Sequence, residues 1–307
     1  MGNNLHSVLM IRPSCFRRNS DTATNNYFQN KILNINQDLI LKNAILEFDK
    51  FFFKIKQCGI DVHVYQDDLK RDTPDSIYPN NWITFHSKKR IALYPMYAKN
   101  RRLERNEEVL KFLEQKNIII NESIDYSNAE KKEYFLEGTG SMVLDRINKK
   151  SYCSISERTN EHLVYEFCND FQYMPIIFNS FQDHQNNRKP IYHTNVMMCI
   201  AQNYSVICLD AIDNKDEREM VKKSLEDDNK EIITISENQL KLFTGNMIEL
   251  TKENKSFLFM SQTAYNSLNE NQLERLKSFS KLIYSSVDTI EKCGGGSVRC
   301  MIAEIFN

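Results

Sequence analysis

The chain has 307 residues, of which 41% are hydrophobic and 26% charged, the balance of a globular protein in water. Its 40 basic and 41 acidic side chains leave a formal net charge of -1, so the composition favours neither nucleic acid nor a membrane surface as a partner. No apolar run approaches the roughly 20 residues of a membrane span, and no secretory signal is visible, so we expect a cytoplasmic protein.

The eight cysteines and six histidines show no spacing typical of a structural site. No CxxC pair occurs, and the histidines do not cluster with cysteines at the spacing of zinc ligands. In a chain without an export signal, we expect free thiols rather than a disulfide framework.

A repeating pattern of two short strands, an amphipathic helix and a third strand runs along the chain. A partial unit comes first, with a strand at 7–11, a helix at 38–57 and a strand at 62–65. Four complete units follow, each of two strands, a helix and a last strand: 82–86, 90–94, 103–115 and 117–120; 141–145, 151–155, 159–167 and 174–178; 196–200, 205–209, 216–226 and 231–235; 246–250, 257–260, 270–279 and 282–284. A strand-like segment at 297–306 has no helix after it.

The two ends of the chain together complete a fifth unit. A ring closed by its own termini leaves no exposed sheet edge, which an open array of repeats would have. The pattern therefore predicts an α/β fold, a five-bladed α/β propeller of ββαβ repeats closed by the two termini. We expect residues 1–307 to form a single domain.

The starts of the units recur at a nearly constant interval. They lie at Asn81, Glu137, His193, Gly245 and Cys300, in steps of 56, 56, 52 and 55 residues. Equivalent positions in a closed ring face the same axis, so these residues should converge. Cysteine, histidine and glutamate at three of the five positions indicate a nucleophile, an acid/base group and an orienting carboxylate.

Each of these three residues also has a purely structural interpretation. Cys300 follows three consecutive glycines, which allow close approach of a ligand, but most free cysteines are buried packing residues. The packing interpretation suits Cys153, Cys199 and Cys208, which lie in apolar strands. His193 alone could be a hydrogen-bonded structural residue, and Glu137 could cap backbone amides or bind a cation.

Several segments resemble the guanidino-group-modifying superfamily, which has the pentein fold and includes arginine deiminases, dimethylarginine hydrolases and amidinotransferases. The resemblance spans nearly the whole chain and includes Arg101-Arg102. Its hallmarks are most similar to those of arginine-deiminase-related, citrulline-utilization hydrolases. They are the segments 79–82, 135–141, 193–198 and 294–300, while the segments 75–81 and 156–160 are similar to those of the dimethylarginine hydrolases.

This resemblance implies roles for individual residues and a covalent mechanism without metal or organic cofactor. Cys300 would attack the central carbon of the substrate while Glu137 holds the substrate nitrogens. His193 would protonate the departing amine or ammonia and then activate water. Arg158 would anchor the α-carboxylate, and Asp75 would bind the α-amine or a side-chain nitrogen.

Three amides depart from the pattern of the deiminases. Asn80 and Asn81 replace an acidic pair, and Asn195 replaces an aspartate. Carboxylates suit a cationic guanidinium, whereas amides offer both donors and acceptors to a neutral group. We therefore hypothesise a neutral ureido substrate such as citrulline, or a less basic guanidine.

Two other functions stay open on sequence alone. An amidinotransferase would use the same thiol and pass the amidino group to an acceptor amine. A non-catalytic pentein-fold binding protein is the third alternative, because fold does not determine function. In the hydrolase interpretation the partner is a small guanidino or ureido amino acid, and a homodimer is compatible with the sequence.

Overall fold

The computed structural model describes residues 5–29 and 36–306, and within these residues the fold is mixed α/β. Five three-stranded sheets in this part of the chain share one plan, in which the middle strand pairs antiparallel with one neighbour and parallel with the other. The sheets are β17 (Ala303–Phe306), β1 (Leu5–Arg12) and β2 (Val62–Gln66); β3 (Ile83–His86), β4 (Arg90–Leu93) and β5 (Glu122–Asp125); β6 (Met142–Asp145), β7 (Lys150–Ser154) and β8 (Met174–Phe178); β11 (Met198–Ile200), β12 (Tyr204–Ile207) and β13 (Glu231–Thr234); β14 (Ile248–Lys252), β15 (Lys255–Ser261) and β16 (Lys281–Ser285).

The two ends of the chain share one sheet, as the repeat pattern predicts. Strand β1 pairs antiparallel with β17, where Leu9 lies opposite Ala303. On its other side β1 pairs parallel with β2, where Val8 lies opposite Val62. The N- and C-terminal segments therefore complete one repeat between them.

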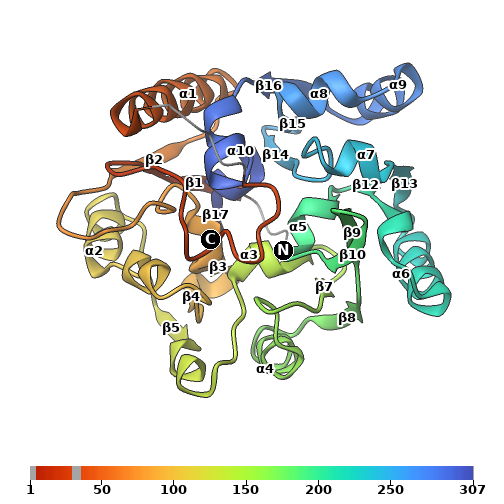
Figure 1. Ribbon diagram of the computed structural model, residues 1–307, viewed down its shortest axis with the longest axis horizontal. Helices are drawn as coiled ribbons and strands as arrows, with labels where there is room; N and C mark the ends of the chain where they lie inside the picture. The colour runs from red at the N-terminus through yellow and green to blue at the C-terminus, as the bar shows by residue number, and fades with distance from the viewer. Residues whose placement is uncertain (1–4, 30–35, 307) are drawn as a thin grey trace.

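A helix links the middle strand of each sheet to the parallel strand, because a parallel pair needs a crossover connection. These helices are α1 (Gln37–Gln57), α2 (Glu107–Gln115), α4 (Glu161–Phe171), α6 (Lys215–Asp227) and α9 (Glu270–Phe279). They lie at the periphery in Figure 1, whereas short turns and strand β17 lie near the centre. No helix in the described part of the chain is long and apolar enough to cross a membrane.

An asparagine side chain caps the N-terminus of each of these five helices and accepts a backbone N–H from the first turn. The capping residues are Asn36, Asn106, Asn160, Asn214 and Asn269. Part of the high asparagine content of the sequence thus serves to start the helices. Helix α1 shows how they pack, since its buried residues recur every three or four positions from Ile40 to Ile55.

One predicted strand is wrong. The third strand of the first complete unit is β5 at Glu122–Asp125, not 117–120. Helix α2 ends with Lys116 as its C-cap, and Asn117 has a left-handed φ of 61°. The backbone N–H of Ile118 donates to Leu113 O, and the Ile118 side chain is buried in the core. Ile118 and, in part, Ile120 therefore pack against the core before the strand begins, while Ile119 is exposed.

Other predicted boundaries change because short helical turns precede the first strands. The segments 141–145, 196–200 and 297–306 begin as turns rather than as strands, and the predicted helix from 103 begins as a 3-10 turn. These turns are α3 (Gly138–Ser141), α5 (Thr194–Met197), η6 (Val298–Met301) and η3 (Asn100–Glu104). Further elements not predicted are the hairpin of β9 (Phe181–His184) and β10 (Asn187–Pro190), α7 (Glu237–Leu240), α8 (Gln262–Ser267), α10 (Asp288–Gly294), η1 (Pro79–Asn81), η2 (Ser87–Lys89), η4 (Ser127–Lys132) and η5 (Leu209–Ala211).

Candidate active site

Glu137, His193 and Cys300 lie at the short turns that precede the first strands of their repeats, whereas Asp75 lies before η1 and Arg158 lies between β7 and α4. Turn α3 contacts η1 and α5, and η1 also contacts η6, so turns far apart in sequence meet. One pocket is lined by Asp75, Asn81, Arg158, His193 and Cys300. The convergence inferred from the spacing of the units is therefore present in the structure.

Glu137 and His193 form a hydrogen-bonded pair in the interior. Glu137 Oε2 lies 2.8 Å from His193 Nε2, and neither side chain is more than 2% exposed. The backbone N–H of Tyr97 donates to Glu137 Oε1 at 3.0 Å. Burial raises the pKa of Glu137, but Arg158, His193 and Arg101 outweigh burial and hold the pKa below its usual range. Glu137 is therefore an ionised carboxylate.

The ionised carboxylate determines the tautomer of His193. A carboxylate can only accept, so Nε2 carries the proton and Nδ1 is the basic nitrogen. Burial lowers the pKa of His193 to about 4, although Glu137 opposes the shift. The imidazole is therefore neutral near pH 7 and can accept a proton.

Two side-chain amides contact the sulfur of Cys300. Asn246 Nδ2 lies 3.3 Å and Asn195 Nδ2 3.5 Å from Cys300 Sγ. Asn246 Oδ1 accepts the backbone N–H of Arg299 at 3.1 Å, which fixes the orientation of this amide. Two donors around one sulfur stabilise negative charge on it. Asn246 was not among the predicted site residues, although Gly245 next to it marks a unit start.

Arg158 is fully buried and turned toward the N-terminal segment. Its Nε donates to Asn25 Oδ1 at 2.9 Å and its Nη2 to Thr22 O at 2.9 Å, while Nη2 also contacts Asn25 Oδ1. Its Nη1 lies 3.5 Å from Glu137 Oε2, and its guanidinium lies 4.8 Å from the centre of the Tyr192 ring. Oxygen atoms of Asn25, Thr22 and Glu137 therefore already contact several of the guanidinium N–H donors of Arg158.

Asp75 lies in a buried cluster that also includes residues of the N-terminal segment. Its Oδ2 accepts from Asn19 Nδ2 at 2.7 Å and from Thr22 Oγ1 at 3.2 Å, and it lies 3.8 Å from Arg101 Nε. Its Oδ1 has no hydrogen-bond partner among the described residues. Burial raises the pKa of Asp75, while Arg101 and the hydrogen bonds from Asn19 and Thr22 oppose the shift.

Arg101, which the resemblance identified without a role, connects three site carboxylates. It makes a bidentate pair with Glu104 at 2.8 and 2.9 Å and approaches Asp75 and Glu137 at 3.8 and 3.6 Å. Its Nη1 also donates to Asn81 Oδ1 at 2.9 Å. This arginine therefore supplies the positive charge that the buried carboxylates share.

The amides of Asn80 and Asn81 are only partly used by the protein. Neither Asn80 Nδ2 nor Asn80 Oδ1 has a partner among the described residues, and Asn81 Nδ2 has none either. Both residues are at most 2% exposed. Buried amides without partners leave donors and an acceptor for a bound molecule.

Two glycines are required by close packing in the site. A Cβ at Gly140 would lie 2.4 Å from Asn81 Nδ2 and 2.7 Å from the His193 ring. A Cβ at Gly294 would lie 2.1 Å from Tyr78 Oη. The glycine loop before Cys300 is also held by Tyr192, whose hydroxyl donates to Gly295 O at 2.6 Å. The glycines thus allow aromatic and polar side chains to reach the site.

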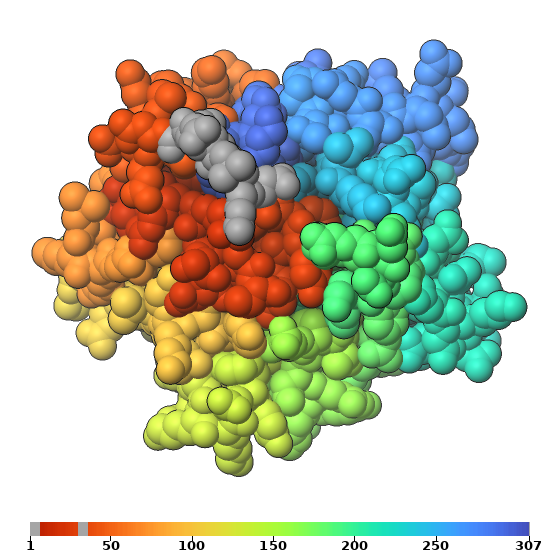
Figure 2. All heavy atoms as spheres, in the orientation of Figure 1, coloured from red at the N-terminus to blue at the C-terminus, as the bar shows by residue number. Residues whose placement is uncertain are grey.

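The segment after β1 covers the site, a feature that the sequence pattern did not show. Thr22 and Asn26 line the pocket, and Asn26 Nδ2 donates to the carbonyls of Gly294 and Gly295 at 3.3 Å. Figure 2 shows this segment, in red, lying over the centre of the viewed face. The remaining pocket has a volume of about 10 Å³, room for about one water molecule.

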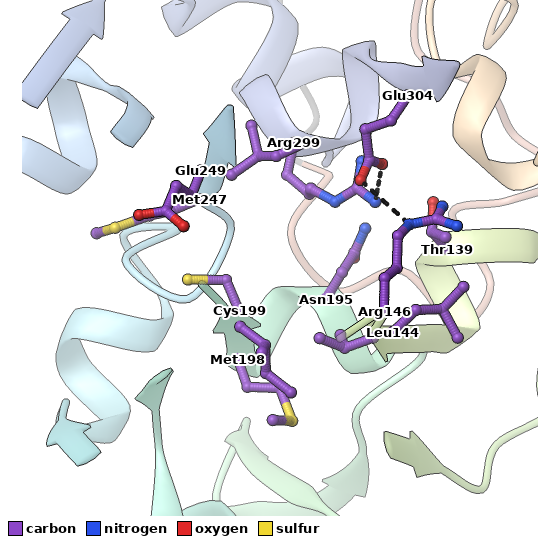
Figure 3. A pocket seen from close by; sticks show the side chains of 13 residues that line it. Thr139, Leu144, Arg146, Asn195, Met198, Cys199, Met247, Glu249, Arg299 and Glu304 are labelled. Carbon is purple, nitrogen blue, oxygen red and sulfur yellow. Dashed lines mark hydrogen bonds and ion pairs between the residues drawn. The ribbon is translucent and has the colours of Figure 1, made fainter. Parts of the chain in front are cut away.

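A second cavity lies behind Cys300 and has a volume of about 50 Å³. Asn195, which contacts the Cys300 sulfur, lines it (Figure 3). Figure 3 also shows Glu304 between two arginines, 2.8 Å from Arg299 Nη2 and 3.8 Å from Arg146 Nε. Asn195 therefore lies between the sulfur and this ion-paired rear wall.

The described residues contain no group of three or more His, Cys, Asp or Glu side chains arranged to hold a metal ion. The chemical groups that the site brings together are a thiol, an imidazole, carboxylates, guanidinium groups and amides. This set suits nucleophilic attack at a planar, nitrogen-substituted carbon.

Comparison with known proteins gives one family match over nearly the whole chain. A family model described as N,N dimethylarginine dimethylhydrolase, eukaryotic, matches residues 12–307. A search of curated proteins finds no match.

Several solved structures have a similar fold. Apo ArgZ, a cyanobacterial arginine dihydrolase, has a TM-score of 0.75 and 15% identity, covering 98% of this chain and 40% of that one. This chain thus spans less than half of that protein's length. The substrate-bound N-terminal domain of ArgZ has a TM-score of 0.73 and 15% identity, covering 98% of each chain. DDAH from Pseudomonas aeruginosa, complexed with citrulline, has a TM-score of 0.64 and 13% identity, covering 98% of this chain and all of that one. These likenesses show a mixed α/β fold of the pentein type.

Proposed function

The chain belongs to the eukaryotic N,N dimethylarginine dimethylhydrolase family, whose members are cysteine-dependent hydrolases of guanidino carbon–nitrogen bonds, and we propose that Cys300, His193 and Glu137 carry out this reaction here. The observation that carries the proposal is the buried Glu137–His193 pair, which lies at 2.8 Å beside the pocket that Cys300 lines. A purely structural thiol has no need of a neutral buried histidine or of two amide donors on its sulfur.

The charges of the site suggest the order of events. A bound guanidinium or ureido group lies against Glu137, and neutral His193 takes the proton of the Cys300 thiol. The thiolate attacks the central carbon, and His193 returns the proton to the departing amine or ammonia. Water, deprotonated by His193, then attacks the same carbon and expels the Cys300 thiolate. Each half-reaction breaks one bond to carbon and forms another.

We further propose that Arg158 and Asp75 hold the amino-acid end of the substrate. Both line the pocket, and Asp75 Oδ1 is available for an ammonium group. Arg158 can bind a carboxylate only if Asn25 and Thr22 release its donors. Movement of the covering segment would also enlarge the pocket from its present volume, which is too small for an amino acid.

The amides in the site favour a substrate that includes a neutral ureido group. Asn80, Asn81 and Asn195 provide donors and acceptors without negative charge. An enzyme that accepts both guanidino and ureido groups would act twice on arginine. The first hydrolysis gives citrulline and ammonia, and the second gives ornithine and carbamate. The similarity to an arginine dihydrolase supports this second candidate, an arginine-to-ornithine activity.

We also propose that the five sheets form one closed five-bladed propeller, with residues 1–307 as a single catalytic domain. Neighbouring sheets contact one another around the molecule, through β17 with β3, β6 with β11, β11 with β14, and β14 with β1, the middle strand of its sheet. Turn α3 supplies the remaining link by contacting both β3 and β6. This order of contacts is the one that a ring requires.

A substrate panel on the wild type and on Cys300→Ala tests the function. Arginine, methylated arginines, agmatine and citrulline are each supplied, and ammonia, methylamines, citrulline and ornithine are quantified. Turnover of at least one compound, absent in Cys300→Ala and retained in a Cys58→Ala control, is expected. Turnover only with an added acceptor amine would indicate an amidinotransferase. No turnover, with Cys300 inert to alkylation, would indicate a binding protein instead.

A further inference from the structure

A cavity of about 590 Å³ opens beside the active site and has no role in the proposed reaction. Its walls come from five segments, residues 27–28, the β9–β10 hairpin, residues 241–243 after α7, Thr263 on α8, and helix α10. Its volume lies in the range of small-molecule sites, roughly 300–1,000 Å³. The cavity is therefore large enough for an amino acid.

A buried amide in this wall has an unused donor. Gln182 is 3% exposed, and its Nε2 has no hydrogen-bond partner among the described residues. A buried N–H without a partner is unfavourable, because it has lost its hydrogen bonds to water without gaining others. A ligand oxygen at this position would satisfy it.

The charged groups of the cavity have both signs. Lys241, Lys292 and Asp288 line it, and none of them forms an ion pair with another described residue. Glu291 adds a carboxylate that is 4% exposed. A molecule that carries both a carboxylate and ammonium groups complements this arrangement better than a simple anion or cation does.

Aromatic side chains provide the apolar part of the wall. Tyr27 stacks on His184 with ring centres 4.5 Å apart, and Phe28 packs against Phe243 at 5.1 Å. Such surfaces suit the methylene chain of a ligand.

We propose that this cavity is a second, non-catalytic site for a basic α-amino acid of about the size of ornithine. Lys292 and Gln182 bind its carboxylate, and Asp288 binds its side-chain ammonium.

Two residues that line the cavity, Glu291 and Phe28, contact residues next to the active site. Glu291 Oε1 accepts from Ser297 Oγ at 2.7 Å, and Ser297 O accepts the backbone N–H of Cys300 at 3.0 Å. Phe28 contacts the edge of Tyr192, whose hydroxyl holds Gly295 O. An occupant therefore touches residues that position the loop of Cys300, so it regulates the reactivity of that thiol.

The test measures binding directly on the full chain with the catalytic pocket blocked. Cys300 is alkylated with 2-chloroacetamidine, complete modification is confirmed by mass spectrometry, and ligands are titrated by calorimetry. L-Ornithine is compared with L-norvaline, which lacks the side-chain ammonium, and with putrescine, which lacks the carboxylate. One ornithine per chain is expected, bound at least tenfold more tightly than either analogue. The measurement does not depend on turnover, so its result is separate from that of the substrate panel.

Substitutions then assign the contacts. Gln182→Leu and Lys292→Ala are each expected to remove the preference for ornithine over putrescine. Asp288→Asn is expected to remove the preference for ornithine over norvaline. The exposed Lys223→Ala on α6 serves as control and should bind like the wild type. No binding to the blocked protein, or equal affinities in all four variants, would overturn the proposal.

Discussion

The sulfur of Cys300 lies between two amide donors, so we expect a charge placed at either amide to change how readily the thiol is alkylated. Asn246 is the nearer donor, and its oxygen is used by the Arg299 N–H. Asn246→Asp keeps the oxygen but replaces the donor with a carboxylate beside the sulfur. Like charges close together raise the pKa of the group that ionises second. We expect the midpoint of iodoacetamide alkylation to rise by at least one pH unit.

The pH profile of alkylation separates this effect from general damage. A second asparagine-to-aspartate change, Asn266→Asp on the exposed side of α8, adds the same charge away from the site. It should leave the midpoint unchanged. An unaltered midpoint in Asn246→Asp would show that this amide does not act on the thiol.

We expect the amides of Asn80 and Asn81 to determine whether the site selects a guanidinium or a ureido group. Charge-assisted hydrogen bonds are roughly twice as strong as neutral ones, so carboxylates would favour a guanidinium over a ureido group. We expect the double change Asn80→Asp and Asn81→Asp to raise the ratio of kcat/KM for arginine to that for citrulline at least tenfold. Asn266→Asp again serves as control. A ratio that does not rise would count against selection of a neutral group by these amides.

Two buried histidines make the folded protein sensitive to acid. Burial lowers the pKa of His193 to about 4 and that of His86 well below its usual value. In the unfolded chain each histidine binds a proton as pH falls below about 6.5, whereas in the folded chain it does not. The free energy of unfolding therefore decreases as pH falls below about 6.5. Each histidine contributes a slope of about 1.4 kcal/mol per pH unit, which for His193 ends near pH 4.

His86 allows this linkage to be tested away from the active site. Its Nε2 lies 2.7 Å from Thr84 Oγ1, and its ring packs on Phe171. A glutamine side chain at this position could keep the bond to Thr84 and would not titrate, so His86→Gln should flatten the dependence of Tm on pH between 6.5 and 4.5. Circular dichroism melts at several pH values provide the measurement. Parallel curves for variant and wild type would contradict the assignment.

At the scale of elements, the periodicity of the sequence predicted most helices and the convergence of the candidate site residues. Glu137, His193 and Cys300 were found because each repeat places its first strand after a turn that faces the centre. The strand order within each repeat followed from the same pattern. Local hydrophobicity misplaced β5, because the run 117–120 is apolar for packing against the core and not for pairing.

The covering segment could not be found by the same reasoning. Residues 13–29 contain no repeating apolar pattern, and their role depends on polar contacts with partners more than 50 residues away, such as Asn25 with Arg158. Asn246 was missed because the repeat position fell on its neighbour Gly245. Long-range hydrogen bonds of this kind leave no periodic signal in a sequence.

The glycine loop offers a test of how an element positions the thiol. A Cβ at Gly294 would meet Tyr78 Oη at 2.1 Å, so Gly294→Ala should displace the loop and slow alkylation of Cys300 about tenfold or more. Tyr78→Phe removes the clashing oxygen, so the double variant should recover part of the rate.

Gly59→Ala is the matched control for the loop. Gly59 has a positive φ of 79°, and a Cβ there would lie 3.8 Å from Lys252 Cγ, an ordinary contact, so an alanine strains the backbone without touching the site. It should lower Tm and leave the alkylation rate unchanged. Equal alkylation rates in Gly294→Ala and the wild type would show that the contact with Tyr78 does not position the thiol.

At the scale of the whole molecule, the closed ring that we propose depends on β17. This strand pairs with β1 and also contacts β3, so it connects the first and last segments of the chain. Ala303 and Ile305 are each 2% exposed, and Arg146 packs over the ring of Phe306. In a closed ring every sheet has two neighbours, so loss of one strand weakens the whole and not only one edge.

Truncation after Ile302 tests this closure while it leaves every active-site residue in place. We expect the truncated chain to lose its cooperative melting transition and its Cys300 reactivity together, because β1 loses its partner and η6 loses the strand that follows it. Removal of Asn307 alone is the control and should change neither property. A truncated chain that melts cooperatively, with the Tm of the wild type, would mean that the ends are held together by something other than this strand. The five sheets would then be better described as an open array.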